Sequence, residues 1–105
     1  MLDPVIHPVN RLRICAVLRS VHALSDGGRL PNGGEMRFSA LRDAVGLSDS
    51  ALSKQLSALE EAGYVARHRD YGSMRGKDVV WVSLTPVGLA AFEGHVDALR
   101  EIAEQ

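Results

Sequence analysis

The stretch LSDSALSKQLSALEEAGYV, which runs from Leu47 to Val65, decides the fold of this chain. Ser48 is a preferred helix N-cap, and Asp49 places negative charge at the positive end of the helix dipole. Gly63 is a typical C-terminal stop. These signals predict a helix that runs to Ala62.

The predicted helix has an apolar side and a polar side. At about 100° per residue, three leucines fall on one side and a group of mostly short polar residues falls opposite. The apolar side is Leu52, Leu56 and Leu59, and the polar side, here named the serine face, is Ser50, Ser53, Lys54 and Ser57. Solvated helix surfaces usually carry Glu, Lys, Arg or Gln, because these residues form helices well and serine does not. Helix stability therefore does not explain the serine face.

A shorter helix is predicted directly before this one. Ser39 can cap it, it spans Ala40 to Val45, and Gly46 ends it. The two helices together make residues 39–62 a helix-turn-helix.

The first third of the chain is predicted to contain one helix and one loop. Residues 8–24 form an amphipathic helix with Pro8 in its first turn. Four glycines and a proline in residues 25–35 predict a flexible surface loop. The sequence MRFS, Met36 to Ser39, can form a very short strand.

Residues 64–84 are predicted to form an antiparallel hairpin. The segments Tyr64–Asp70 and Val79–Leu84 alternate or are β-branched enough to be strands. The basic, glycine-containing YGSMRGKD between them is expected to be a connection too long for a tight turn.

The last helix, residues 86–105, opens with Thr85 as N-cap and Pro86 in the first turn. Its apolar residues recur at spacings of three and four, which is typical of a coiled-coil-like contact. A monomer could pack this seam against its own first helix. Because that helix must also cover the helix-turn-helix, we predict instead a homodimer in which the last helices pair. The predicted dimer interface is Leu89, Phe92, Val96, Leu99 and Ala103.

Length and composition predict one domain, residues 1–105. A chain of 105 residues with 46% hydrophobic composition can bury one core of ordinary size. Its start lacks the apolar core of a secretory signal, and no stretch approaches the roughly 20 apolar residues of a membrane span. The single cysteine, Cys15, cannot form an internal disulfide. We therefore expect a cytoplasmic protein without a membrane segment.

The charges are distributed unevenly, although the formal net charge is only -1. Residues 67–77 contain four basic side chains and one acidic one, whereas residues 86–105 contain one basic and four acidic ones. One end of the domain is thus suited to a polyanion and the other would be repelled by it. Both segments could also be ordinary solvated surfaces.

These elements together resemble the winged-helix regulators of the MarR and ArsR type, and among them the small single-domain members. The resemblance is carried by FSALRDAVGLSDSALSKQLSALEEAGYV, the basic hairpin after it, and LTPVG at Leu84 to Gly88. It implies an α+β fold, mainly helical, in which a helix-turn-helix is followed by a two-stranded wing and a dimerisation helix. The wing departs from the family pattern, because Ser73, Met74 and Arg75 stand where a D-x-R spacing is common.

The resemblance implies that the serine face enters the major groove of double-stranded DNA. That groove is about 12 Å wide, so short side chains allow close entry. Ser50, Ser53 and Ser57 can bond base edges or phosphates, and Lys54 can reach a guanine edge or a backbone oxygen. Asp49 could accept from a cytosine amine, but its place at the helix start already explains it.

The wing is expected to lie across the DNA backbone and to reach the minor groove, whose negative potential favours arginine. Arg75 is the candidate for the wing tip, with Arg69 and Lys77 on phosphates. The amide or hydroxyl of Ser39 can hold a further phosphate. Two early strand residues stay outside the predicted site, because they can face away from DNA or pair with Glu60 and Glu61; they are Arg67 and His68.

No pattern in the sequence supports catalysis, a metal site or a cofactor. The four histidines lack ligand spacing, there is no C-x-C or C-x-x-C, and no glycine loop follows a strand. Cys15 is expected to be a small core residue; the alternative, a redox-sensing thiol, requires a depressed pKa. A small-molecule effector is not favoured, because only one helix after the wing is available to line a pocket.

The sequence therefore predicts a DNA-binding transcriptional regulator, expected to be a repressor that binds an inverted repeat as a homodimer. The alternative is a winged-helix module that binds another protein, with DNA contacts incidental. The dependence of binding on salt and on mutation of the basic residues separates the two.

Overall fold

The computed structural model describes residues 1–25, 34–74 and 77–105 of the chain. In chain order the elements are α1 (Val9–Ser25), β1 (Met36–Arg37), α2 (Phe38–Val45), α3 (Asp49–Glu61), β2 (Val65–Met74), β3 (Lys77–Leu84) and α4 (Pro86–Ala103). The predicted fold class is confirmed, including the helix-turn-helix, the two-stranded wing and the short third strand.

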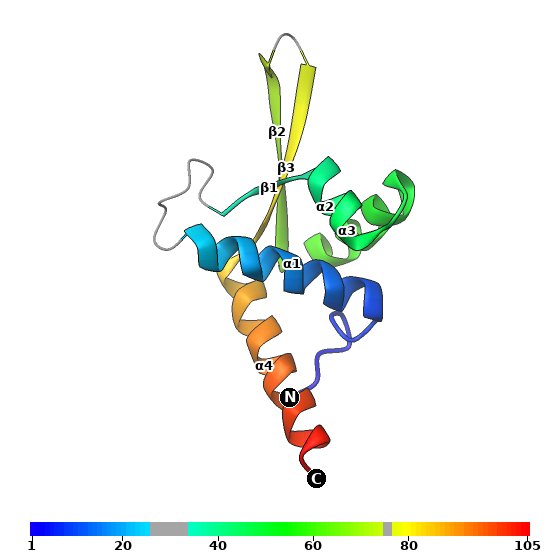
Figure 1. Ribbon diagram of the computed structural model, residues 1–105, viewed down its shortest axis with the longest axis vertical. Helices are drawn as coiled ribbons and strands as arrows, with labels where there is room; N and C mark the ends of the chain where they lie inside the picture. The colour runs from blue at the N-terminus through cyan, green and yellow to red at the C-terminus, as the bar shows by residue number, and fades with distance from the viewer. Residues whose placement is uncertain (26–33, 75–76) are drawn as a thin grey trace.

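The molecule is elongated, with extents of 54 × 31 × 22 Å. The wing formed by β2 and β3 points to one end of the long axis and α4 points to the other, with α1 crossing between them (Figure 1). Helices α2 and α3 lie together beside the base of the wing (Figure 1). The helix-turn-helix and the wing are therefore neighbours, whereas the C-terminus lies far from both.

The strands form one antiparallel sheet in the order β1-β3-β2. Strands β2 and β3 pair from Val65 opposite Leu84 out to Met74 opposite Lys77, with an irregularity in register after Asp70. The expectation of a long connection is therefore wrong, because β2 extends to Met74 and β3 begins at Lys77, inside YGSMRGKD. The pairing lengthens the wing beyond the predicted strands.

The core lies where α1 meets the helix-turn-helix, the sheet and α4. Leu52, Leu56 and Leu59 of α3 are fully buried in it, as their spacing predicts. From the other elements the core takes Ile6, Ile14, Cys15, Leu18, Leu41, Val45, Val65, Val82, Leu84 and Phe92. Burial of the leucine side fixes which way the serine face points.

The start of α2 differs from the prediction. The helix begins at Phe38 with Arg37 in the N-cap position, and Arg37 makes no side-chain capping hydrogen bond. Ser39 is thus not the cap but an exposed residue in the first turn. The physical reason is that Arg37 pairs with Trp81 in the sheet and the half-buried Phe38 packs on the core, so the chain turns directly from strand into helix.

Helix α4 is anchored to the end of the helix-turn-helix. The Thr85 hydroxyl accepts from the Gly88 amide at 2.9 Å, as an N-cap does, and donates to the Gly63 carbonyl at 2.7 Å. The Thr85 amide also donates to the Tyr64 carbonyl at 3.0 Å. These bonds tie the first turn of α4 to the junction between α3 and β2.

Candidate nucleic-acid interface

The recognition candidate α3 is held at its start by local bonds. The Ser48 hydroxyl accepts from the Ala51 amide at 3.2 Å, which confirms Ser48 as N-cap. Gly46 ends α2 with φ of +69°, a left-handed conformation that glycine adopts without strain. The turn between the helices is thus built by residues that the sequence identified.

A charge cluster that sequence reasoning missed closes the same turn. The Arg42 guanidinium bonds the Asp49 carboxylate at 2.8 Å and the Asp43 carboxylate at 3.0 Å. Asp49 therefore has a partner within the protein, in keeping with a structural role at the helix start. The only sequence signal for this pair is the position of a basic and an acidic residue on either side of the turn.

The serine face points away from the core, but its members are not equally accessible. Ser50, Lys54 and Ser57 are exposed, whereas Ser53 is half-buried. Ser50 approaches only the Ser48 hydroxyl, at 3.4 Å, among its side-chain contacts in the described residues. Ser50 and Lys54 are thus the members most open to a partner.

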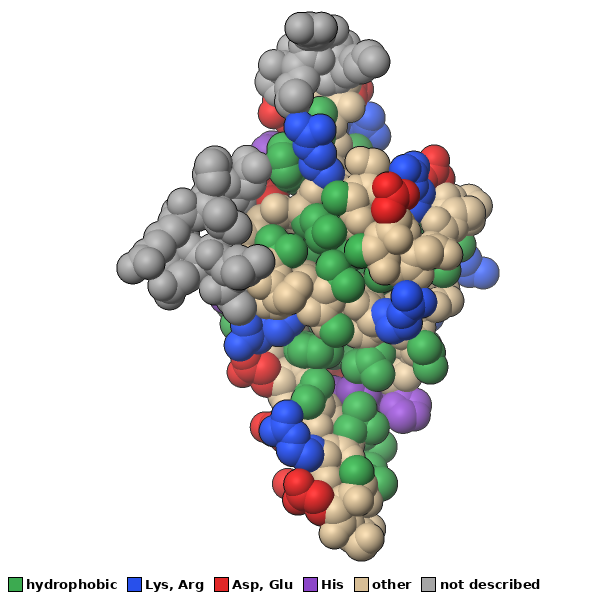
Figure 2. Space-filling view, in the orientation of Figure 1, with side chains coloured by type: hydrophobic (Ala, Val, Ile, Leu, Met, Phe, Trp, Pro, Cys, Tyr) green, Lys and Arg blue, Asp and Glu red, His purple; other side chains and the backbone are tan. Residues whose placement is uncertain are grey.

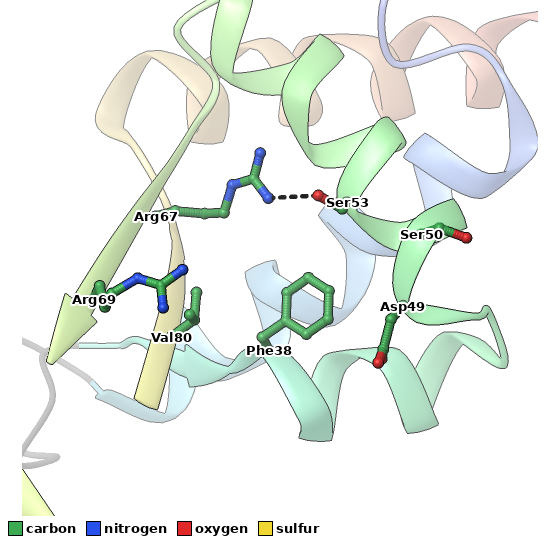
Figure 3. Close-up of a pocket in the computed structure, with 7 residues that line it drawn as sticks. All are labelled: Phe38, Asp49, Ser50, Ser53, Arg67, Arg69 and Val80. Atoms are coloured by element: carbon green, nitrogen blue, oxygen red, sulfur yellow. Dashed lines mark hydrogen bonds between the residues drawn. The ribbon is translucent and has the colours of Figure 1, made fainter. Parts of the chain in front are cut away.

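Ser53 and Ser57 are joined to β2 by Arg67. The Arg67 guanidinium donates to both hydroxyl oxygens at 3.0 Å and to the Glu60 carboxylate at 2.7 Å (Figure 3 shows the bond to Ser53). Of the alternatives that the sequence left open for Arg67, the structure shows pairing with Glu60. The bonds to the two serines were not predicted, because they depend on how α3 and β2 pack and not on either sequence segment.

Arg69 stands two residues further along β2, so it lies on the same side of the strand as Arg67. Its guanidinium pairs with the Asp78 carboxylate at 3.3 Å and lies 5.9 Å from the centre of the Tyr71 ring. The Arg69 side chain is half exposed. Of the other predicted wing residues, Lys77 is described as part of β3 without its side chain, and Arg75 lies outside the described residues.

A hollow of about 700 Å³ opens between α3 and the wing (Figure 3). Two of its seven lining residues are apolar and two are arginines, and Asp49 supplies a negative charge; they are Phe38, Asp49, Ser50, Ser53, Arg67, Arg69 and Val80. The hollow therefore brings Ser50 and Ser53 together with Arg69, three of the residues that the sequence assigned to DNA.

On the face in view, basic side chains lie near the helix-turn-helix and the base of the wing, and others lie further down the molecule (Figure 2). Acidic and basic side chains lie together on the tapered end formed by α4, where Arg19 pairs with Glu93 and Arg100 with Asp97 (Figure 2). Both signs of charge thus occur at both ends of this face, so the uneven charge counted along the sequence does not appear here as a division of the surface.

The predicted dimer seam on α4 divides into two parts. Phe92 is buried in the core of its own subunit, and Leu89 and Val96 pack against that core. Leu99 is half-buried and Ala103 exposed, and the neighbouring Ile102, which the prediction omitted, is 52% exposed. The residues of the seam near the start of α4 thus pack within their own subunit, whereas the residues at its C-terminal end are at least partly exposed.

Cys15 is fully buried among core residues of α1. Burial, with a contribution from the negative charge of Asp3, raises the pKa of the Cys15 thiol to about 12. A redox-sensing thiol needs the opposite shift. Cys15 thus has the environment of a small core residue.

Within residues 1–25, 34–74 and 77–105, no group of three His, Cys, Asp or Glu side chains is placed to hold a metal ion. None of the helices described there has both the length and the apolar character needed to cross a membrane.

A family model for the winged helix DNA-binding domain matches residues 30–103. The chain belongs to this family. The match spans the helix-turn-helix, the wing and α4, which are the elements that form the candidate interface and the seam. No curated protein matches the chain in sequence.

Solved structures agree with this assignment to the winged helix DNA-binding domains. A transcriptional regulator homologue from Pyrococcus horikoshii OT3 superposes with a TM-score of 0.71 at 15% identity, over 95% of this chain and 85% of that one. A possible transcriptional regulator for arsenical resistance reaches 0.62 at 26% identity, over 96% and 92%. NadR in complex with 4-hydroxyphenylacetate reaches 0.54 at 22% identity, over 90% and 70%. The resemblance to MarR and ArsR-like transcriptional regulators is thereby confirmed. The family model and the structure at 26% identity point to a DNA-binding regulator.

Proposed function

We propose that this chain is a sequence-specific double-stranded DNA-binding repressor that binds an inverted repeat as a homodimer and occludes a promoter. One observation carries the proposal. Ser50 of α3 and the half-exposed Arg69 of β2 line the same hollow. The exposed Lys54 lies one helical turn after Ser50, on the side of α3 opposite the leucines that fill the core. A helix with short polar side chains beside a basic strand fits the major groove and its flanking backbone.

In this proposal the exposed part of α3 reads bases. Ser50 offers a hydroxyl, Ser57 offers its hydroxyl oxygen as an acceptor, and Lys54 reaches a guanine edge or a phosphate. Asp49 stays with Arg42, whose guanidinium offsets its repulsion from phosphates. The exposed Ser39, in the first turn of α2, offers its amide or hydroxyl to a phosphate.

The wing contacts the backbone. Arg69 binds a phosphate after leaving Asp78, since an ion pair between half-exposed side chains is worth at most about 1 kcal/mol and is readily exchanged. Lys77 binds a second phosphate, and Arg75 enters the minor groove. Each phosphate contact releases counterions, so binding weakens as salt rises.

The homodimer pairs the open C-terminal part of α4. Leu99, Ile102 and Ala103 form its centre, because Phe92 is committed to the core of its own subunit. In Figure 2 hydrophobic side chains run along the tapered end of the molecule that α4 forms. Two-fold pairing there would present two copies of α3 to half-sites one helical turn apart, about 34 Å.

Selection of binding sites from random duplexes tests the proposal. The selected sequences should share an inverted repeat, and affinity for it should fall steeply between low and physiological salt. Placing the repeat across a promoter should lower transcription in a reconstituted assay. Enrichment of no sequence, together with salt-insensitive binding, would favour the protein-interaction module instead.

A further inference from the structure

The guanidinium of Arg67 is surrounded by partners within its own subunit. It reaches three α3 side chains, those of Ser53, Ser57 and Glu60, which lie at spacings of four and three along one stripe of the helix. With a second contact to Glu60, four interactions engage a group that has five N–H donors. Glu60 also balances its charge. Arg67 is therefore poorly placed to bind a phosphate.

The same bonds decide what each serine hydroxyl can offer. Ser57 donates its proton to the Ser53 carbonyl at 3.0 Å and accepts from Arg67, so its donor is already used. Ser53 accepts from Arg67 at 3.0 Å, and within the described residues its own hydroxyl proton makes no hydrogen bond. Ser53 also lines the hollow between α3 and the wing. Of these two hydroxyls, the one on Ser53 thus retains a free proton.

Accepting a hydrogen bond from a cation polarises a hydroxyl and strengthens it as a donor. The base edges of the major groove offer acceptors for such a donor, at purine N7, guanine O6 and thymine O4. Because Ser53 is short and half-buried, it reaches only an acceptor that comes close to α3.

We propose that Arg67 is a positioning residue for DNA recognition, which holds Ser53 as a hydrogen-bond donor to an acceptor atom on a base edge. The inference rests on the proposed DNA-binding function. Arg67 itself touches no phosphate and keeps its contacts to Glu60 and Ser57 in the complex. It contributes to discrimination between bases and not to the salt dependence of binding.

The test uses the full chain and the duplex obtained by random selection, together with duplexes that change one base pair at a time. Fluorescence anisotropy measures affinity for each duplex over a range of salt. Ser53→Ala should abolish the preference at one position of each half-site, a loss of about three- to tenfold for one hydrogen bond. Weakening on all duplexes alike would mean a phosphate acceptor and would overturn the proposal.

The paired variant Arg67→Gln with Glu60→Gln removes the guanidinium and its bonds to α3 without changing the net charge. It should lose the same preference as Ser53→Ala, and adding Ser53→Ala to it should cause no further loss. Its salt slope should equal that of the wild type. Arg67→Lys is a second variant, which keeps the charge but replaces the three nitrogens of the planar guanidinium by one compact ammonium, and it should lose the same preference.

Arg69→Gln is the matched control, because Arg69 lies two residues after Arg67 on the same side of β2. It should reduce the salt slope by about 0.9 per subunit and keep the base preferences. An equal fall in slope for the paired variant, or a preference retained in it, would overturn the positioning role while leaving DNA binding in place. Failure of the wild type to select any duplex would overturn both proposals.

Discussion

The backbone amide of Asp3 donates a hydrogen bond of 2.8 Å to Nδ1 of His95, 92 residues further along the chain. The Asp3 carboxylate in turn accepts from the Tyr64 hydroxyl, at the junction between α3 and β2. The N-terminal segment therefore joins the middle of α4 to the residues that follow α3. His95 is fully buried, and among the described residues its Nε2 has no hydrogen-bond partner.

This arrangement predicts a stability that falls with acid. Burial and the neighbouring His7 lower the pKa of His95 below its ordinary value of 6.5, although Asp3 opposes the shift. The folded state thus binds the proton less well than the unfolded state. Stability should be complete above about pH 6.5 and decline as the pH falls through 6.5 toward the lowered pKa.

Thermal unfolding between pH 7.5 and 5.5 measures this effect. His95→Gln removes the titrating group and should flatten the pH dependence over that range, even if it lowers stability throughout. An unchanged slope in His95→Gln would assign the pH dependence to another group.

Two glycines of α4, Gly88 and Gly94, should respond in opposite ways to substitution by alanine. A Cβ at Gly88 would lie 2.0 Å from the Tyr64 carbonyl oxygen, so backbone would have to move. A Cβ at Gly94 would meet nothing within 4 Å. Gly88→Ala should lose at least about 2 kcal/mol of unfolding free energy by overpacking, whereas Gly94→Ala should gain about 0.5–1 kcal/mol from helix propensity. Urea unfolding gives both values, and equal effects would mean that α4 does not pack this closely.

Cys15 is predicted to be chemically inert in the folded protein. Its pKa of about 12 leaves essentially no thiolate at neutral pH, and its side chain is fully buried. An aromatic disulfide reagent that reacts with thiols should therefore modify Cys15 in the native chain only as fast as the chain unfolds locally. In guanidinium, where the chain is unfolded, the modification should be rapid. Hydrogen peroxide at neutral pH should leave DNA affinity unchanged. Rapid native labelling would restore the redox-sensor interpretation.

The local parts of the fold could be predicted because their causes are local. Leu52, Leu56 and Leu59 repeat with the helical period, and Ser48 and Thr85 cap the helices that follow them. Ser39 failed as a cap because its position depends on the pairing of Arg37 with Trp81, far away in sequence.

The wing and the candidate interface also have features that depend on contacts between distant parts of the sequence. Gly72 and Ser73 have the composition of a turn, yet β2 continues to Met74 because β3 supplies a partner. The serine face could be predicted as an outward surface. The bonds from Arg67 to the serines could not be predicted, because the sequence offers Glu60 as the evident partner of Arg67 and the serines reach its guanidinium only when α3 packs on β2.

The dimer proposal makes a prediction about mass. Leu99→Glu places a charge in the open part of the α4 seam and should yield monomers, because an unpaired buried charge costs several kcal/mol at an interface. Sedimentation velocity at several protein concentrations measures the mass of the particle. Glu101→Ala, at an exposed acidic position on the same helix, should leave the dimer intact. An unchanged mass for Leu99→Glu would place the interface elsewhere.

Lys54→Ala tests the role of α3 most directly. Lys54 is exposed on the serine face, so the substitution leaves the core untouched. If it reaches a guanine edge, the variant should bind the selected repeat about 5- to 100-fold more weakly, and the preference at one base pair should relax. If it reaches a phosphate, all duplexes should weaken alike and the salt slope should fall by about 0.9 per subunit. Arg100→Ala, on α4 at the opposite end of the molecule from the wing, should change neither quantity. Equal affinity of Lys54→Ala and wild type for every duplex would remove α3 from the interface and leave the protein-interaction module as the better account.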